Sequence, residues 1–298
     1  MLAAKVLQRA GCEVLPVTFV SAFFGATQAK DSAAILNLPL IVHDLTAAHL
    51  QIVKHPQLGH GKNLNPCLDC RSLMLQSAER IRQERKAHIL ATGEVLGQRP
   101  FSQNKNAFAR VEKIANLAGK ILRPLSAQLL PATTFENEGL VEREQLEAIS
   151  GRSRKVQQQL AAKFAIKHFP HPAGGCILTN PQFAQRGAAL LESFPRCTAQ
   201  DFQVLRLGRC FIFKDFFLVL GRNESENASI ESFARAHFPE QFLLRMKNAP
   251  GPTCLLRFFA DRDKIESQAL QSAQGKILEF SKKASAGKIE FAIERLGS

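Results

Sequence analysis

The sequence predicts an α/β protein, in which a doubly wound parallel sheet precedes a smaller α+β module. Over the first 90 residues, short β-branched runs alternate with helical patterns, which is typical of parallel sheets with crossover helices. Near residue 200 the pattern changes to strand-like runs that follow one another. A chain of 298 residues, 45% hydrophobic and 22% charged, suits either one large domain or two modest ones and excludes a wholly disordered protein.

The first 93 residues supply the elements of the predicted parallel sheet. The expected helices cover residues 2–10, ending at Gly11, and residues 30–37, 46–54 and 71–86. The expected strands cover residues 13–20, 39–44 and 87–93. Ligands of such sheets bind beyond the carboxyl ends of the strands, so one crevice is expected after Val20, after Asp44 and around Thr92-Gly93.

The rest of the chain is less regular until residue 200. Between residues 97 and 181 we expect loops with one helix near 106–117, two helices within 141–167 broken at Ser150-Gly151, and a turn-rich connection with a short strand over 171–181. Beyond it, strands are expected over 202–209, 210–222, 253–260 and 288–296, with a helix over 264–284. We therefore place the domain boundary at 198/199, giving domains 1–198 and 199–298.

The charge balance indicates a polyanionic partner. Lys and Arg number 39 against 26 Asp and Glu, which leaves a net charge of +13. The first 200 residues hold 24 of these cations and 14 of the acidic residues, so most of the excess belongs to the first domain. Nucleic acid is the first expectation, and a basic but otherwise ordinary soluble protein is the alternative.

No apolar run is long enough to span a membrane, and charged residues interrupt any signal peptide. The seven cysteines are an odd and sparse set, unlike a disulfide framework. A reducing, cytoplasmic location is expected.

The sharpest local signal is the pair Cys67 and Cys70, spaced as CxxC just before a predicted helix. Because a helix N-terminus favours negative charge, thiols there could share a metal or a cluster, or cycle to a disulfide. The alternative is a structural pair of partly buried cysteines. A third candidate, Cys176, follows Gly174-Gly175, where a bare backbone suits close approach of a ligand.

Polar and basic segments supply the other candidates. The turn at Thr92-Gly93 could hold a purine or a ribose, although an ordinary strand-ending turn would look the same. A polar loop follows, with Arg99 and Gln103. Three cations lie at the start of a predicted helix: Arg152, Arg154 and Lys155. Positive charge there opposes the helix dipole and suggests a phosphate partner, and an exposed helix start is the alternative.

Five segments in this order resemble the PP-loop ATP pyrophosphatases, a family similar to the tRNA 2-thiouridylases and other tRNA thiolation enzymes: NPCLDC, ATGEVLGQRPFSQ, LRPLSAQLLP, ISGRSRK and FPHPAGGCILT. The resemblance covers roughly residues 1–190 and implies an adenine nucleotide alpha hydrolase-like fold. It further implies a transferase that uses ATP with Mg²⁺ to adenylate a tRNA uridine. A sulfur that a donor protein supplies, held on cysteine or on an iron–sulfur cluster, then displaces AMP.

The resemblance also assigns residues. It makes Cys70 the first catalytic cysteine and Cys176 the second, which carries the persulfide in thiouridylases. With Cys67 added, the three cysteines look like those of thiolases that bind a [4Fe–4S] cluster, so both routes stay open. Nucleotide contacts are implied for Phe19, Ser21, Thr92 and Gly93, and contact with nucleotide or tRNA for Gln103.

The C-terminal module resembles the RNA-binding domain of NFACT proteins through LGRCFIFKDFFLVLGRNESEN and PGPTCLL. That resemblance implies a role for Arg222 and Asn223 in presenting RNA, whereas a hairpin turn is the alternative for Gly-Arg-Asn.

The phosphate loop of the family, Ser-Gly-Gly-x-Asp-Ser, would directly precede the helix that starts at Met1, and the sequence does not contain it. One explanation is a longer active chain with about 15 to 20 more residues, a strand plus the loop. The other explanation is loss of ATP cleavage, which leaves an RNA-binding protein with a degenerate nucleotide site. We favour the first explanation because the downstream cysteines and the Ala-Thr-Gly-Glu turn are present. A PP-loop ligase acting on another substrate is the enzyme alternative.

Overall fold

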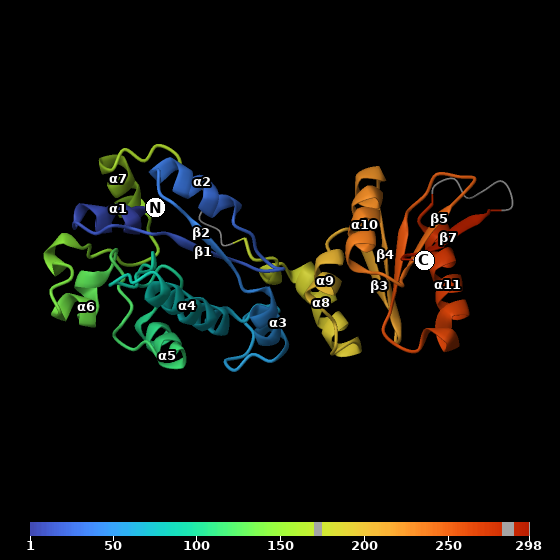
Figure 1. The fold of residues 1–298 in the computed structure, drawn as a ribbon, viewed down its shortest axis with the longest axis horizontal. Coiled ribbons are helices and arrows are strands. Elements are labelled where there is room, and N and C mark those ends of the chain that lie inside the picture. The colour runs from blue at the N-terminus through green and yellow to red at the C-terminus, as the bar shows by residue number, and fades with distance from the viewer. Residues whose placement is uncertain (170–174, 282–288, 298) are drawn as a thin grey trace. The chain divides into compact units, whose positions relative to one another are not determined.

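The computed structural model describes residues 1–169, 175–281 and 289–297. The fold is mixed α/β, with a two-stranded parallel sheet and a five-stranded antiparallel sheet. Contacts divide the chain into a first unit, Met1–Gly61 with Asn65–Gly175, and a second unit, Lys62–Leu64 with Cys176–Ser298 (Figure 1). The expected separation into domains 1–198 and 199–298 stays a prediction.

The first unit contains the parallel sheet. Its strands β1 (Val17–Val20) and β2 (Ile41–Asp44) pair in register from Val17 with Ile41 to Val20 with Asp44. The expectation of a parallel pairing here is confirmed. Its helices are α1 (Leu2–Arg9), α2 (Thr27–Leu36), α3 (Thr46–Lys54), α4 (Cys67–Glu84), α5 (Lys105–Ala115), α6 (Thr134–Asn137) and α7 (Lys155–Lys163).

The prediction of a third strand over 87–93 is wrong. This segment forms one isolated parallel bridge, in which the Leu122 amide donates to Leu90 O and the Thr92 amide donates to Leu122 O, both at 2.9 Å. The next bond of a parallel ladder would need the amide of residue 124. Pro124 has no N–H, so the pairing stops after one bridge.

The prediction of a helix within 141–149 is also wrong. The structure shows only the 3₁₀ turn η2 (Arg143–Gln145) there. The amide of Glu147 donates to Pro124 O and that of Ile149 donates to Leu125 O, each at 2.8 Å. These bonds to a neighbouring segment replace the ones that a helix would make within itself.

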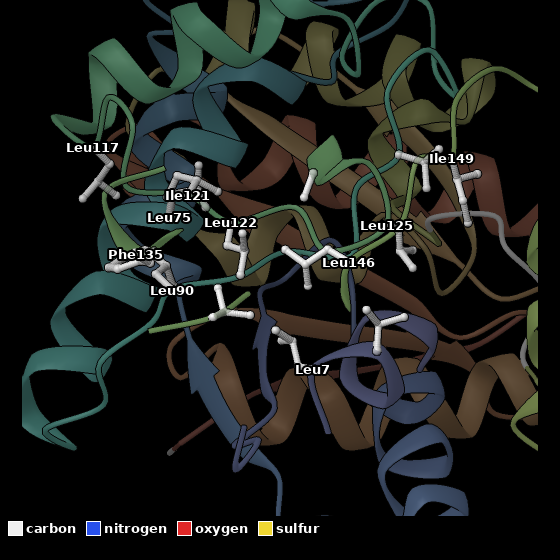
Figure 2. Packing of buried hydrophobic residues seen from close by; sticks show 14 of the residues in the cluster. Leu7, Leu75, Leu90, Leu117, Ile121, Leu122, Leu125, Phe135, Leu146 and Ile149 are labelled. Carbon is white, nitrogen blue, oxygen red and sulfur yellow. The ribbon is translucent and has the colours of Figure 1, made fainter. Parts of the chain in front are cut away.

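One apolar core joins these loops to helices α1, α4, α5, α6 and α7 of the first unit. Figure 2 shows Leu7 of α1 and Leu75 of α4 in the same cluster as the bridge residues Leu90 and Leu122. All four are less than 10% exposed. The core therefore fixes the bridge, and with it the turn that follows at Thr92.

The second unit is built on the antiparallel sheet. Its strands β3 (Arg209–Ile212), β4 (Phe216–Leu220), β5 (Phe242–Met246), β6 (Cys254–Phe258) and β7 (Phe291–Arg295) lie in the order β3-β4-β6-β5-β7. Helix α11 (Arg262–Glu279) packs on one face of this sheet through Ala269, Ala273 and Ile277, and α10 (Glu224–His237) lies on the opposite face (Figure 1). The remaining helices are α8 (Pro181–Ser193) and α9 (Ala199–Val204).

The expected strand over 202–209 is mostly helix α9 and a turn. A capping box starts this helix, since the Thr198 hydroxyl accepts from the Asp201 amide and the Asp201 carboxylate accepts from the Thr198 amide. This local signal outweighs the apolar run that follows it.

Among the residues that the structure describes, none of the helices has the length and apolar character of a membrane span.

Candidate active site and nucleic-acid interface

The two cysteines of the CxxC pair lie inside the first turn of α4 rather than before it. Cys67 is the first residue of the helix and is exposed, and Cys70 is half-buried. Asn65 Nδ2 donates to Cys67 Sγ at 3.0 Å. Both thiols therefore lie at the helix end where the backbone N–H groups favour negative charge.

Asp69, between the two cysteines, anchors the preceding loop. Its carboxylate is buried and accepts from the amides of Gln57 and Leu58, each at 3.1 Å. These bonds hold residues 57 and 58 against the first turn of α4. Sequence reasoning missed this role, although an acidic residue in a first helical turn is a familiar signal.

Arg71 joins the cysteine helix to two other predicted site segments. Its Nε lies 2.9 Å from Glu94 Oε1, and its Nη1 donates to the carbonyl of Ser102. One side chain therefore connects the residue after Cys70 with the turn at 92–94 and with the polar loop at 97–104. Sequence reasoning missed Arg71 because no spacing rule pairs a helical arginine with a carboxylate 23 positions later.

A second arginine completes the network around the turn. Arg123 Nε lies 3.0 Å from Glu94 Oε2, Arg123 Nη1 lies 2.6 Å from Glu112, and its guanidinium covers the ring of Phe108 at 3.8 Å. The hydroxyl of Thr92 donates to Glu94 Oε2 at 3.2 Å. The predicted nucleotide-contacting turn is thus held by ion pairs whose side chains are largely buried.

Gly93 and Gln103 differ in what surrounds them. A Cβ on Gly93 would lie 3.9 Å from Ala3 of α1, an ordinary contact, so packing alone does not require glycine there. Gln103 is only 8% exposed, and its side-chain oxygen accepts no hydrogen bond from any described residue. An unpaired buried acceptor costs about 1–3 kcal/mol, which a ligand N–H donor would recover.

The carboxyl end of β1 packs on a buried histidine that sequence reasoning also missed. Ser21 Oγ accepts from the Phe23 amide at 3.1 Å and lies 3.1 Å from His49 Nδ1. Burial lowers the pKa of His49 to about 4, so its imidazole is neutral at pH 7. The rings of Phe23 and Phe24 contact it at centroid distances of 5.4 and 5.2 Å.

Phe19 and Ser21, the two predicted adenosine contacts, lie together at this end of β1. Phe19 is half-buried and pairs with His43 across the sheet.

The sequence signal that could have identified His49 is its place on the apolar side of α3, beside Leu50 and one turn before Val53.

The polar loop and the basic segment at 152–155 lie side by side. The Gly151 amide donates to Leu96 O at 2.7 Å, next to the bridge between Leu96 and Ser150. Gly97 has φ +76°, and a Cβ on it would lie 3.2 Å from the Gly151 nitrogen, so this approach needs glycine. The contact brings four predicted RNA-binding residues onto neighbouring segments: Arg99, Arg152, Arg154 and Lys155.

Cys176 belongs to the second unit, and most of the preceding turn, residues 170–174, lies outside the described residues. Its carbonyl accepts from the Thr179 hydroxyl at 2.7 Å, and Thr179 O accepts from Asn63 Nδ2 at 2.8 Å. The segment before the CxxC pair and the segment after Cys176 are therefore parts of one unit. Within the described ranges, no group of three or more His, Cys, Asp or Glu side chains is placed to hold a metal ion.

The two predicted RNA-binding residues of the C-terminal module have structural partners. Arg222 pairs with Glu226 at 2.7 Å, and the Asn223 side chain accepts from the Glu226 amide and caps α10. Helix α10 starts here, where the alternative expectation was a hairpin turn. Both residues keep an exposed surface, so their role in presenting RNA stays a prediction.

Comparisons of the chain with models of protein families, with curated proteins and with solved structures find no match.

Proposed function

We propose that the chain is a tRNA-modifying sulfurtransferase with a doubly wound nucleotide-binding domain and an RNA-binding C-terminal module. The observation that carries the proposal is the double contact of Arg71, which joins the cysteine helix to the Thr92–Glu94 turn and to the loop of Gln103. The resemblance assigns these three segments to sulfur transfer, nucleotide binding and RNA binding, and the contacts of Arg71 join them in one network.

One feature of the first unit supports the binding of an adenine nucleotide, and another supports a doubly wound parallel sheet. The buried, unpaired oxygen of Gln103 suits a donor such as the exocyclic amino group of adenine. The parallel pair β1–β2 and the parallel bridges of Ala91 with Leu122 and Leu96 with Ser150 fit a doubly wound arrangement.

In the proposed reaction, the uridine oxygen attacks the α-phosphate of ATP, and pyrophosphate leaves. ATP bound with Mg²⁺ supplies the activation. The outer sulfur of a cysteine persulfide, loaded by a donor protein, then attacks the uridine carbon that bears the adenylated oxygen, and AMP leaves. The second cysteine thiol attacks the remaining S–S bond, which releases the thionucleoside and leaves a disulfide that a thiol reductant reduces. The chain's own contribution is to hold the Cys70 thiol in the first turn of α4, and Cys176 of the second unit is the other proposed sulfur-handling residue. Sulfur carried on a [4Fe–4S] cluster at Cys67, Cys70 and Cys176 is the second route.

The test measures thionucleosides in tRNA by chromatography and mass spectrometry after deletion of the gene. We expect one thionucleoside to disappear, to return with the wild-type gene, and to stay absent with Cys70→Ser or Cys176→Ser. Cys210→Ser is the matched control and should restore it. Unchanged thionucleosides after deletion would refute the proposal. Cys67→Ala separates the two routes, because only the cluster route needs that thiol.

A further inference from the structure

Phe101 is the most exposed of the large hydrophobic side chains that the structure describes, at 93%. A phenylalanine is stabilised by burial, so the fold gains nothing from an aromatic ring at this position. No described ring contact or cation–π contact involves Phe101. A function outside the fold would explain why this turn carries an aromatic residue.

The loop that carries Phe101 is fixed from several sides. The Arg99 carbonyl accepts from the amides of Ser102 at 3.2 Å and Gln103 at 2.8 Å, which closes a β-turn with Pro100 at its first central position. Asn104 Nδ2 donates to Pro100 O at 2.5 Å, and its Oδ1 caps α5. A turn held this way loses little backbone freedom when the ring that it carries binds a partner.

Exposed cations flank Phe101 along the chain, and others lie on the neighbouring segment after Gly151. Arg99 precedes it by two residues, Lys105 follows it by four, and both are exposed. Helix α5 continues with exposed Arg110 and Lys113, while its one acidic residue, Glu112, is paired with Arg123. The contact of Gly97 with Gly151 adds two exposed cations: Arg152 and Lys155.

We propose that Phe101 is a stacking platform for one unpaired base of single-stranded RNA, whose flanking phosphates bind Arg99 and Lys105. This inference rests on the RNA partner of the proposed function. Aromatic rings stack on unpaired bases in single-stranded loops, and cations on either side hold the backbone. One ring among cations lacks the apolar centre that a protein interface needs.

The test uses an RNA stem-loop with 2-aminopurine at one loop position, titrated with the full-length protein. We expect base stacking to quench the fluorescence. Phe101→Ala should weaken binding about 5- to 150-fold, Phe101→Tyr should retain it, and Phe101→Leu should behave like alanine. Lys105→Gln should lower the slope of log affinity against log salt by about 1. Ile35→Ala, on the exposed side of α2, is the matched surface control and should leave affinity unchanged.

The outcomes separate this inference from the function on which it rests. Binding of RNA with equal affinity by wild type and Phe101→Ala overturns the stacking role and leaves the sulfurtransferase proposal standing. Equal affinity of Phe101→Leu and wild type also overturns it, because an apolar contact would then suffice. Absence of RNA binding by the wild-type protein overturns both.

Discussion

His49 makes the stability of the first unit depend on pH. The residue is 1% exposed, and burial lowers the pKa of its imidazole from 6.5 to about 4. The unfolded chain therefore takes up a proton as the pH falls through 6.5, whereas the folded chain does so only near pH 4. Full stability holds above pH 6.5 and is lost progressively down to pH 4. At about 1.4 kcal/mol for each pKa unit, the loss reaches about 3 kcal/mol.

The substitution His49→Asn isolates this effect. Asparagine places an oxygen near the position of Nδ1, where it can accept from the Ser21 hydroxyl, and it does not titrate. Unfolding in urea at pH 7, 6, 5 and 4, with pulsed hydrogen exchange of the α3 amides, reports on the first unit alone. We expect the wild type to lose about 3 kcal/mol more than the variant between pH 7 and pH 4. Exposed His43, replaced by asparagine, is the control and should follow the wild type.

Parallel stability curves for wild type and His49→Asn over this range would refute the reasoning. Such curves would mean that the folded protein protonates His49 as readily as the unfolded chain does. The burial between Phe23, Phe24 and Ser21 would then not hold in solution.

Three further predictions concern named contacts. Arg71→Ala should lower the free energy of unfolding of the first unit by about 1–3 kcal/mol in urea and abolish formation of the thionucleoside in tRNA. Arg80 is exposed on the same helix, and Arg80→Ala should change that free energy by less than about 0.5 kcal/mol. Burial raises the pKa of Cys210 to about 11, so at pH 8 iodoacetamide should modify the exposed Cys67 before Cys210. Peptide mass spectrometry measures the order of labelling, and early labelling of Cys210 would contradict its burial. Asn223→Ala should lower the free energy of unfolding by about 1 kcal/mol because the helix cap is lost, and Asn223→Asp should keep the cap. Loss of RNA binding by Asn223→Asp without a loss of stability would show a role of Asn223 beyond capping.

Helices and strands with strong local periodicity were predictable from the sequence. The pattern over 46–54 gives α3 with the same bounds, and the runs over 13–20 and 39–44 contain β1 and β2. The prediction of a third strand failed because its outcome depends on Pro124, which lies in a partner segment, 31 residues after Gly93. The pairing of Leu90 with Leu122 is a tertiary contact, and propensity within 87–93 does not contain it.

In the site too, local motifs were predictable from the sequence and tertiary contacts were not. The motifs point to Cys70, Thr92 and Gln103, and the structure ties their segments together. The residues that do so, Arg71 and Arg123, are ordinary surface types in the sequence. Their function appears only when the fold places Glu94 between them.

The proposed reaction requires that the chain activates tRNA with ATP before sulfur is transferred. With ATP labelled at the α-phosphate, Mg²⁺ and tRNA but no sulfur donor, this step would place labelled AMP on the tRNA and release pyrophosphate. We predict labelling of tRNA and release of pyrophosphate that both persist in Cys70→Ser, because adenylation precedes the step that needs the thiol. Salt-sensitive binding of tRNA by the wild-type protein, with neither labelling of tRNA nor release of pyrophosphate, would contradict the proposal and identify an RNA-binding protein with a degenerate nucleotide site.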